Sequence, residues 1–335
     1  MTFNEIWDEF ITEKSRRVKP SSISSYNWIW KSIKDFFGDK EITAITTKMV
    51  EKWAISLLDT LSKKSLKDRL LLVNNIIDYY GYEYEKPVTK IQMKYIRWPS
   101  VNIYGSDIEK VKTFSPDDIK AMLKVIAVDP QPRNLLIAVM IATGIRIGEA
   151  CALTYENLNI ETKSIEITGT LERIAIDETF TDEACERMNI KILHKSKKSA
   201  VIISTPKCTS SRRSIPIPGE LFKVLKKFKD LYPSGYYIGS NSFSPVEPRT
   251  LRVYYNKLLK KSGIEKQLSP HSLRHTYATM LITSGVDVKT TAALLGHGDT
   301  ATTLGIYSHA TAESKQKAMS SSIGKQFKKM IGIER

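Results

Sequence analysis

The sequence predicts a mainly α-helical protein of two domains, with a small antiparallel β-sheet in the second domain. Apolar residues recur at helical spacing through residues 1–98. Residues 99–112 lose that spacing and carry Pro, Gly and Ser, which predicts an extended linker. Segments within residues 160–217 alternate apolar and polar side chains between helical stretches. A chain of 335 residues is long enough for a core in each domain.

The first domain, residues 1–98, is expected to consist of short amphipathic helices. Thr2 and Glu5 fit a capping box that opens the first helix. The second helix carries an apolar stripe that we interpret as core, made of Ile23, Tyr26, Trp30, Ile33 and Phe37. Further helices are expected at about 47–58 and 63–80. The lysines and arginines on the opposite faces are candidate DNA contacts.

The second domain is expected to cover residues 113–310. Ser115 as N-cap and Pro116 in the first turn predict a helix over 115–128, and another follows over 131–143. The segments SIEITGT, AVIISTP and SRRSIPIP are predicted strands. Between them, residues 177–198 form an insertion whose structure the sequence leaves open.

Helices are expected again from about residue 218 to the end. The tail, residues 311–335, has Ile323, Phe327 and Ile331 at helical spacing. This tail helix is expected to pack on its own chain or to dock on a neighbouring protomer.

The charge balance indicates a polyanionic partner. The chain has 51 Lys and Arg against 36 Asp and Glu, a formal net charge of +15. Such an excess suggests nucleic acid, although an ordinary basic protein is the alternative. Cys151, Cys185 and Cys208 are odd in number and widely spaced, which argues against a disulfide framework and a structural zinc site. Without a long apolar run or a signal peptide, no membrane partner and a cytoplasmic location are expected.

Two short motifs place cationic side chains near turns. In ATGIRIGEA, residues 142–150, Gly144 breaks a helix, Arg146 lies on the turn, and Glu149 follows one helical turn later. A guanidinium there can bind two phosphate oxygens, although a surface Arg–Glu pair is the simpler interpretation. Lys207 lies near a strand end, where it can protonate a leaving oxygen or simply be solvated. We interpret Arg212 and Arg213 as DNA-backbone contacts or solvated charges.

The stretch HSLRHTYATM predicts a helix that begins with a phosphate-binding pair. Ser269 is the expected N-cap, and His271 and Arg274 project together at i, i+3. Anions are favoured at such a helix N-terminus. Zinc is the alternative because His275 follows His271 at i, i+4, but no HExxH glutamate or cysteine pair supports it.

The stretch LLGHGDTATTLGIYSHA supplies the last two candidates. Gly296 ends a helix, His297 follows it, and Tyr307 comes ten residues later. Taken alone, Tyr307 would be a packed aromatic.

Together and in this order, these motifs resemble the tyrosine recombinase, or phage integrase, family. The resemblance lies in ATGIRIGEA, in TPK before an arginine-rich hairpin, in HSLRHTYAT, and in LLGH followed by the tyrosine of GIYSH. It implies a SAM-like helical core-binding domain and a mixed α+β catalytic domain, joined as a C-shaped DNA clamp. Its implied catalytic set is Arg146, Lys207, His271, Arg274, His297 and Tyr307, with Glu149 in support.

The resemblance also implies the chemistry. Tyr307 would attack a DNA phosphate to give a 3′-phosphotyrosine, with no cofactor and no metal. Arg146 and Arg274 would stabilise the transition state, Lys207 would be the acid, and His271 the base. The hairpin is one residue longer than in some relatives, so the alternatives to Lys207 are Lys195, Lys197 and Lys198.

The expected partner is double-stranded DNA with inverted-repeat core sites, on which the protein is expected to form a homotetramer. Accessory DNA-bending or directionality factors are further candidate partners. A nucleoid-associated protein is therefore expected. The chain starts almost directly at the helical unit, which favours a DNA invertase, an Xer-like resolvase or a compact integrase. The insertion at 177–198 favours a mobile-element integrase, which we take as the main interpretation. A type IB topoisomerase and a non-catalytic DNA-binding protein are the remaining alternatives.

Overall fold

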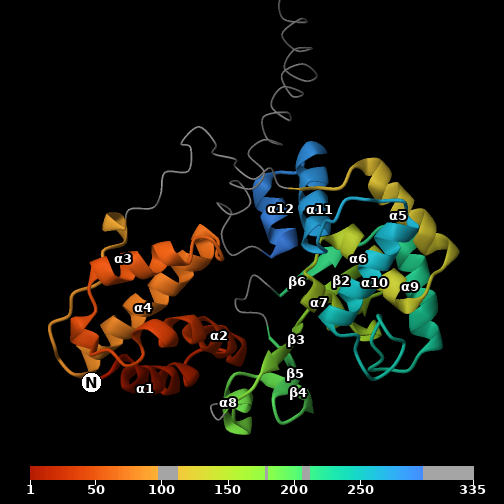
Figure 1. Ribbon diagram of the computed structural model, residues 1–335. Coiled ribbons are helices and arrows are strands. Elements are labelled where there is room, and N and C mark those ends of the chain that lie inside the picture. The colour runs from red at the N-terminus through yellow and green to blue at the C-terminus, as the bar shows by residue number, and fades with distance from the viewer. Residues whose placement is uncertain (97–111, 178–179, 206–211, 297–335) are drawn as a thin grey trace, which may run out of the picture. The chain divides into compact units, whose positions relative to one another are not determined.

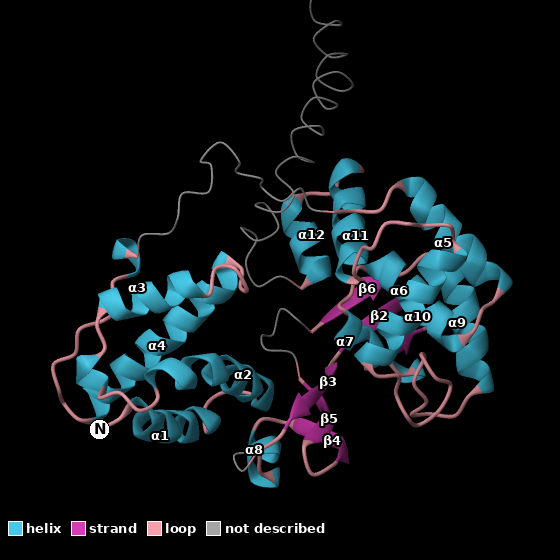
Figure 2. Ribbon diagram, in the orientation of Figure 1, coloured by secondary structure: helices cyan, strands magenta, loops and turns pink. Residues whose placement is uncertain are grey.

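The computed structural model describes residues 1–96, 112–177, 180–205 and 212–296. Contacts divide the chain into two compact units. The first comprises Met1–Ser106 and Arg173–Val201, and the second comprises Asp107–Glu172 and Ile202–Arg335. The helices dominate both units, and strands are confined to short sheets (Figure 1, Figure 2). In the part described, no helix is long and apolar enough to cross a membrane.

The first unit is built on four N-terminal α-helices. Its elements are α1 (Phe3–Ser15), α2 (Pro20–Phe37), η1 (Ile42–Ala44), α3 (Thr47–Ser56), α4 (Lys63–Glu83), η2 (Met93–Tyr95), α8 (Asp182–Arg187) and β4 (Ile190–Lys195). The strands β3 (Thr170–Ala175) and β5 (Ser199–Ser204) run across the boundary between the two units.

The N-terminal helices enclose an aromatic core. The indoles of Trp7 and Trp30 stack with ring centroids 4.5 Å apart. The predicted stripe on α2 packs into this core, with Tyr26 only partly buried. The predicted capping box of α1 is also confirmed: the Thr2 hydroxyl accepts from the Glu5 amide, and the Glu5 carboxylate accepts from the Thr2 amide. Local side-chain chemistry therefore determines where this helix begins.

The insertion left open by the sequence contains α8 and β4. The Thr181 hydroxyl caps α8 by accepting from the Ala184 amide at 3.1 Å. The Asn27 side-chain amide of α2 donates to the Asp177 carboxylate. Val18, Ile23 and Phe180 line a small cavity between this segment and the N-terminal helices. These contacts explain why residues 173–201 belong to the first unit.

The second unit surrounds a central helix. Its elements are α5 (Pro116–Val128), α6 (Pro132–Thr143), α7 (Ile147–Cys151), η3 (Tyr155–Asn157), β1 (Leu158–Asn159), β2 (Ser164–Ile167), β6 (Arg213–Pro216), α9 (Gly219–Leu231), α10 (Pro248–Lys261), α11 (His271–Thr283) and α12 (Val288–Leu295). Every residue from Leu135 to Ile141 in α6 is buried. Helix α6 is packed against four other helices, α5, α7, α10 and α11 (Figure 1). It therefore needs apolar side chains on every side.

The described strands form two three-stranded sheets. One has the order β1-β2-β6 with antiparallel pairing, and Ile165 of β2 lies opposite Ile215 of β6. The other has the order β3-β5-β4. The predicted fold class, mainly α with a small antiparallel sheet, is confirmed, although the strands divide between two sheets (Figure 2).

The predicted side-chain cap of one helix, α11, is absent. Helix α11 begins at His271 with Pro270 at the N-cap position, and no side chain caps it. Ser269 instead contributes its backbone carbonyl, which accepts from the Ser272 amide at 2.9 Å. Pro270 has the helical backbone angles of a first helical residue, so the difference from the prediction is the missing hydrogen bond to the Ser269 side chain.

Candidate active site

The candidate site begins at the sharp turn between α6 and α7. Gly144 ends α6 in the left-handed conformation, with φ of +63°. A Cβ atom at this position would lie 2.5 Å from Cδ1 of Tyr277 on α11. Only glycine satisfies both the backbone angle and this close approach. The turn therefore fixes the position of Arg146 after the end of α6 and lets α11 pack closely against the turn.

The Gly144→Ala variant is expected to be more strongly destabilised than Gly263→Ala. Both glycines have positive φ, but a Cβ at Gly263 would meet nothing within 4 Å. The backbone cost alone is about 1–2 kcal/mol, and the contact with Tyr277 should add about 1–3 kcal/mol. Urea denaturation of the two variants checks this. Equal losses would mean that Tyr277 moves aside at little cost.

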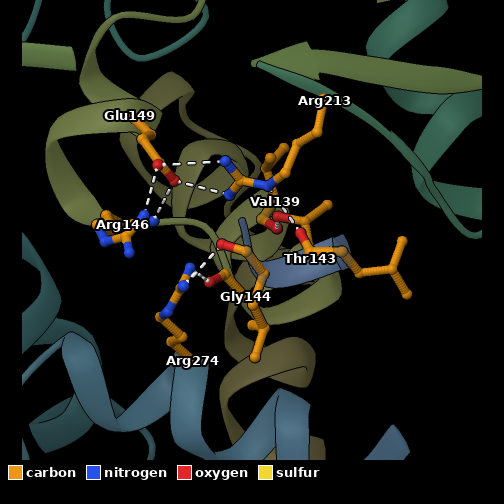
Figure 3. Close-up of polar contacts among 9 residues, drawn as sticks. Val139, Thr143, Gly144, Arg146, Glu149, Arg213 and Arg274 are labelled. Carbon is orange, nitrogen blue, oxygen red and sulfur yellow. Dashed lines mark hydrogen bonds and ion pairs between the residues drawn. The ribbon is translucent and has the colours of Figure 1, made fainter. Parts of the chain in front are cut away.

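Glu149 is the centre of a buried ion-pair network. Its side chain is only 3% exposed. Its carboxylate accepts from the backbone N and the Nη1 of Arg146, both at 2.9 Å, and from Nη2 of Arg213 at 2.9 Å. Burial alone would raise the pKa of Glu149, but the hydrogen bonds and charges of Arg213 and Arg146 hold the pKa below its ordinary value. The carboxylate is therefore ionised and holds both guanidinium groups (Figure 3).

Arg213 corrects a prediction. Its side chain is 6% exposed, so it is neither a solvated charge nor placed on the surface to meet a DNA backbone. Besides its two contacts with Glu149, its Nε donates to the Leu294 carbonyl at 2.7 Å. A Cβ on Gly296 would lie 2.8 Å from Nη1 of Arg213, so glycine is needed here too. Arg213 ties β6 to α7 and to the end of α12.

Arg274 joins the same region from α11. It is 2% exposed, and its guanidinium donates to the Gly144 carbonyl at 3.0 Å and to the Leu295 carbonyl at 2.7 Å. These carbonyls lie at the C-terminal ends of α6 and α12, where the helix dipoles favour a cation. One planar side chain thus fixes two helix ends, and it lies beside the turn that carries Arg146 (Figure 3).

The two histidines of α11 pack together. The rings of His271 and His275 are 4.6 Å apart and perpendicular. Burial, followed by the charges of Arg274 and Arg146, lowers the pKa of His271. Burial, followed by the charges of His271 and Arg274, lowers the pKa of His275 to about 4. Both imidazoles are therefore neutral near pH 7. In a neutral imidazole, the ring nitrogen that carries no hydrogen can accept a proton.

The depressed pKa of His275 predicts a pH-dependent stability. The unfolded chain protonates this histidine near pH 6.5 and the folded chain only near pH 4, so the unfolded state binds more protons between these values. Stability is therefore expected to fall as the pH is lowered through this window. Urea denaturation at about pH 7 and about pH 5.5 should show a smaller loss for His275→Gln than for the wild type. The control is His194→Gln, at an exposed histidine. An equal loss of stability in the wild type, His275→Gln and His194→Gln would contradict the prediction.

The structure brings together four of the predicted site residues. Arg146 and Glu149 are bonded directly, and Arg274 reaches the carbonyl two residues before Arg146. His271 is close enough for both arginines to lower its pKa. Glu149 is not part of a surface pair, as the simpler interpretation had it, because it is buried. Lys207, His297 and Tyr307 lie outside the described residues.

Sequence reasoning missed Arg213, although a signal for it exists. In SRRSIPIP, Arg213 alternates with Ile215 and Ile217, and both isoleucines are buried. Residues two apart in a strand face the same side of a sheet. A cation on the buried face needs a buried acid, and Glu149 provides it. Among the described residues, no cluster of His, Cys, Asp or Glu has the arrangement of a metal site.

Comparison with known families gives the class of the protein. The Phage integrase family model matches residues 112–314, more than half of the chain. A second model, Phage integrase, N-terminal SAM-like domain, matches residues 2–58. The chain therefore belongs to the phage integrase family, and the predicted family resemblance is confirmed.

Named relatives place the chain among tyrosine recombinases and integrases. It is 27% identical over 225 residues to a tyrosine recombinase XerC-like protein of Caldanaerobacter subterraneus subsp. tengcongensis, which covers 63% of this chain and 53% of that protein. The chain thus spans about half the length of that relative. It is also 27% identical to the prophage ps2 probable integrase of Lactococcus lactis subsp. lactis, over 93% of this chain and 80% of the relative.

Solved structures share the fold. The Tn1549 transposon integrase in complex with transposon right end DNA has a TM-score of 0.71 at 20% identity, covering 96% of this chain and 99% of that chain. A lambda integrase tetramer bound to a Holliday junction has a TM-score of 0.61 at 15% identity, covering 90% and 77%. At these identities, the likeness establishes the fold alone.

Proposed function

We propose that the protein is a site-specific recombinase that cuts and rejoins DNA strands through a covalent 3′-phosphotyrosine intermediate and a Holliday junction. The observation that carries this proposal is the convergence of Arg146 and Arg274. Arg146 lies on the turn after α6 and bonds buried Glu149, and Arg274 of α11 donates to the Gly144 carbonyl of the same turn. Two fixed guanidinium groups suit the phosphate of a DNA strand.

The arginine pair explains how charge is stabilised during the reaction. Negative charge gathers on the non-bridging phosphate oxygens in the transition state. Glu149 accepts from Nη1 of Arg146 and so orients the guanidinium. The Arg146 side chain remains 41% exposed, which leaves it accessible to a phosphate. A donor fixed before reaction needs no reorganisation when the charge develops. Glu149 is in this proposal a positioning residue.

The chemical step exchanges one phosphodiester for another. The Tyr307 oxygen attacks phosphorus, the bond from phosphorus to the 5′-oxygen breaks, and that oxygen takes a proton from Lys207. The tyrosine proton passes to His271, whose lowered pKa leaves it neutral and able to accept. His297 donates to a phosphate oxygen. A 5′-hydroxyl of a partner strand then reverses the step, with no cofactor.

The proposed partner is duplex DNA with inverted-repeat core sites. Residues 1–98 would form the core-binding domain, residues 113–310 the catalytic domain, and residues 311–335 a tail that packs on its own chain or docks on a neighbouring protomer. A homotetramer is proposed because two duplexes carry four strands to be exchanged. Support comes from the net charge of +15 and from the similar fold of the lambda integrase tetramer bound to a Holliday junction.

The proposed role is integration and excision of a mobile element. The prophage integrase of Lactococcus lactis aligns over 93% of this chain, which supports this role over inversion or Xer-like resolution. A plasmid that carries two candidate sites distinguishes the outcomes, because excision gives two circles and inversion gives one rearranged circle.

A covalent-adduct assay tests the proposal. Nicked duplexes cut from the DNA beside the gene are mixed with the wild type and with Tyr307→Phe. An SDS-resistant adduct with the wild type alone is expected, on a small subset of the duplexes. An adduct that persists in Tyr307→Phe would refute Tyr307 as the nucleophile. DNA binding by both proteins without any adduct would favour a non-catalytic DNA-binding protein.

A further inference from the structure

Among the described residues of the first unit, one tryptophan is exposed and lies outside the core. Trp28 on α2 is 61% exposed, whereas Trp7, Trp30 and Trp53 are all at most 6% exposed. The Arg69 guanidinium of α4 lies against the Trp28 ring, 5.0 Å from the ring centroid. Helices α2 and α4 pack side by side at this point (Figure 1). The indole therefore rests on a cation at the junction of two helices.

Arg69 is an unusual buried charge. It is 3% exposed, and its Nε donates to the Ser32 hydroxyl at 2.8 Å and its Nη1 to the Ser65 carbonyl at 3.0 Å. Burial lowers the pKa of Arg69, and the charge of Asp68 raises it in part. No ion pair between Arg69 and a carboxylate occurs within the described ranges. A buried cation without a paired acid is costly for folding alone.

Exposed lysines outnumber exposed acids on α2 and in the first turns of α4, where the exposed acids are Asp35 and Asp68. Lys31 is exposed one helical turn after Trp28, and Lys63, Lys64 and Lys67 are exposed in the first turns of α4. The N-terminus of α4, capped by Ser62, adds the positive end of a helix dipole. A fixed aromatic ring among lysines is suited to the sugars and base edges of nucleic acid, whose phosphates the lysines neutralise.

We propose that Trp28 contacts duplex DNA directly and that Arg69 is the positioning residue that holds its ring. The guanidinium that lies over the ring restricts the indole before binding, so little side-chain entropy is lost when DNA arrives. Arg69 also adds positive charge beneath the contact. A protein partner is the alternative occupant of an exposed tryptophan, but the excess of exposed lysines on α2 and at the start of α4 favours a polyanion. The inference rests on the proposed action on duplex DNA.

Tryptophan fluorescence tests the contact. In a Trp98→Phe background, Trp28 is the exposed emitter beside three buried indoles. The probes are the nicked duplexes of the adduct assay and a duplex of scrambled sequence. Protection of Trp28 from acrylamide quenching by the first probe is expected. Unchanged quenching while the wild type still forms its adduct would overturn the contact and leave the proposed function standing. Protection of Trp28 by these duplexes without any adduct would support the contact and would count against the proposed function.

Binding measurements test the two roles. Trp28→Ala is expected to weaken binding about tenfold, the effect of one lost aromatic contact of about 1.4 kcal/mol. Arg69→Lys should weaken binding less and should increase acrylamide quenching of Trp28 in the free protein. The matched control is Tyr82→Ala, which removes another exposed aromatic, 83% exposed, from the far end of α4. Equal affinities for Trp28→Ala and Tyr82→Ala would overturn the proposal.

Discussion

Replacement of Glu149 with alanine is expected to lower the free energy of unfolding by about 3–5 kcal/mol. The variant keeps Arg213, which is 6% exposed, but removes the carboxylate that accepts two of its hydrogen bonds. A buried cation without its acid bears the full cost of desolvation. Urea denaturation monitored by circular dichroism measures the loss.

An exposed ion pair is the control for Glu149. Glu220 and Lys223 are 88% and 72% exposed, and Glu220→Ala should cost at most about 1 kcal/mol. Glu149→Gln keeps the shape and one acceptor, so an intermediate loss is expected. If Glu149→Ala lost no more than Glu220→Ala, water would have to enter and solvate Arg213. The role of Glu149 in the site would then be limited to Arg146.

The contact within the site that spacing alone predicts is local in the chain. Arg146 and Glu149 are three residues apart at the start of α7, and the spacing of a capping interaction places them in contact. Gly144 precedes them in the left-handed conformation that a helix end favours. Short-range geometry of this kind is largely independent of the rest of the fold, so motif reasoning suffices.

The parts that sequence reasoning missed depend on long-range packing. Arg213 meets a carboxylate 64 positions earlier and a carbonyl 81 positions later, and no local pattern reveals both partners. Ser269 before Pro270 has the composition of a helix cap, but composition does not determine whether the serine side chain bonds, and here only its backbone carbonyl accepts from the first turn. The assignments of Lys207, His297 and Tyr307 stay predictions that rest on the family resemblance.

Substitution of Arg274 by lysine is expected to reduce the rate of covalent adduct formation by about 10²–10³. Lysine keeps the charge but lacks the planar fork that donates to the Gly144 and Leu295 carbonyls in different directions. A misplaced ammonium also leaves one of these buried carbonyls without a donor, at a cost of about 1–3 kcal/mol in stability. The rate is measured from SDS-resistant adduct over time on nicked duplexes.

Two measurements separate the catalytic loss from the structural one. Rates are compared well below the melting temperature of the variant, where the folded fraction is complete, and non-covalent DNA binding is measured in parallel. Exposed Arg187 on α8 provides the control, since Arg187→Lys should leave the rate within a few-fold of the wild type. If Arg274→Lys melted at a lower temperature but formed adduct at the wild-type rate, Arg274 would only tie α6 to α12. Stabilisation of the charge on the phosphate oxygens would then depend on Arg146 alone.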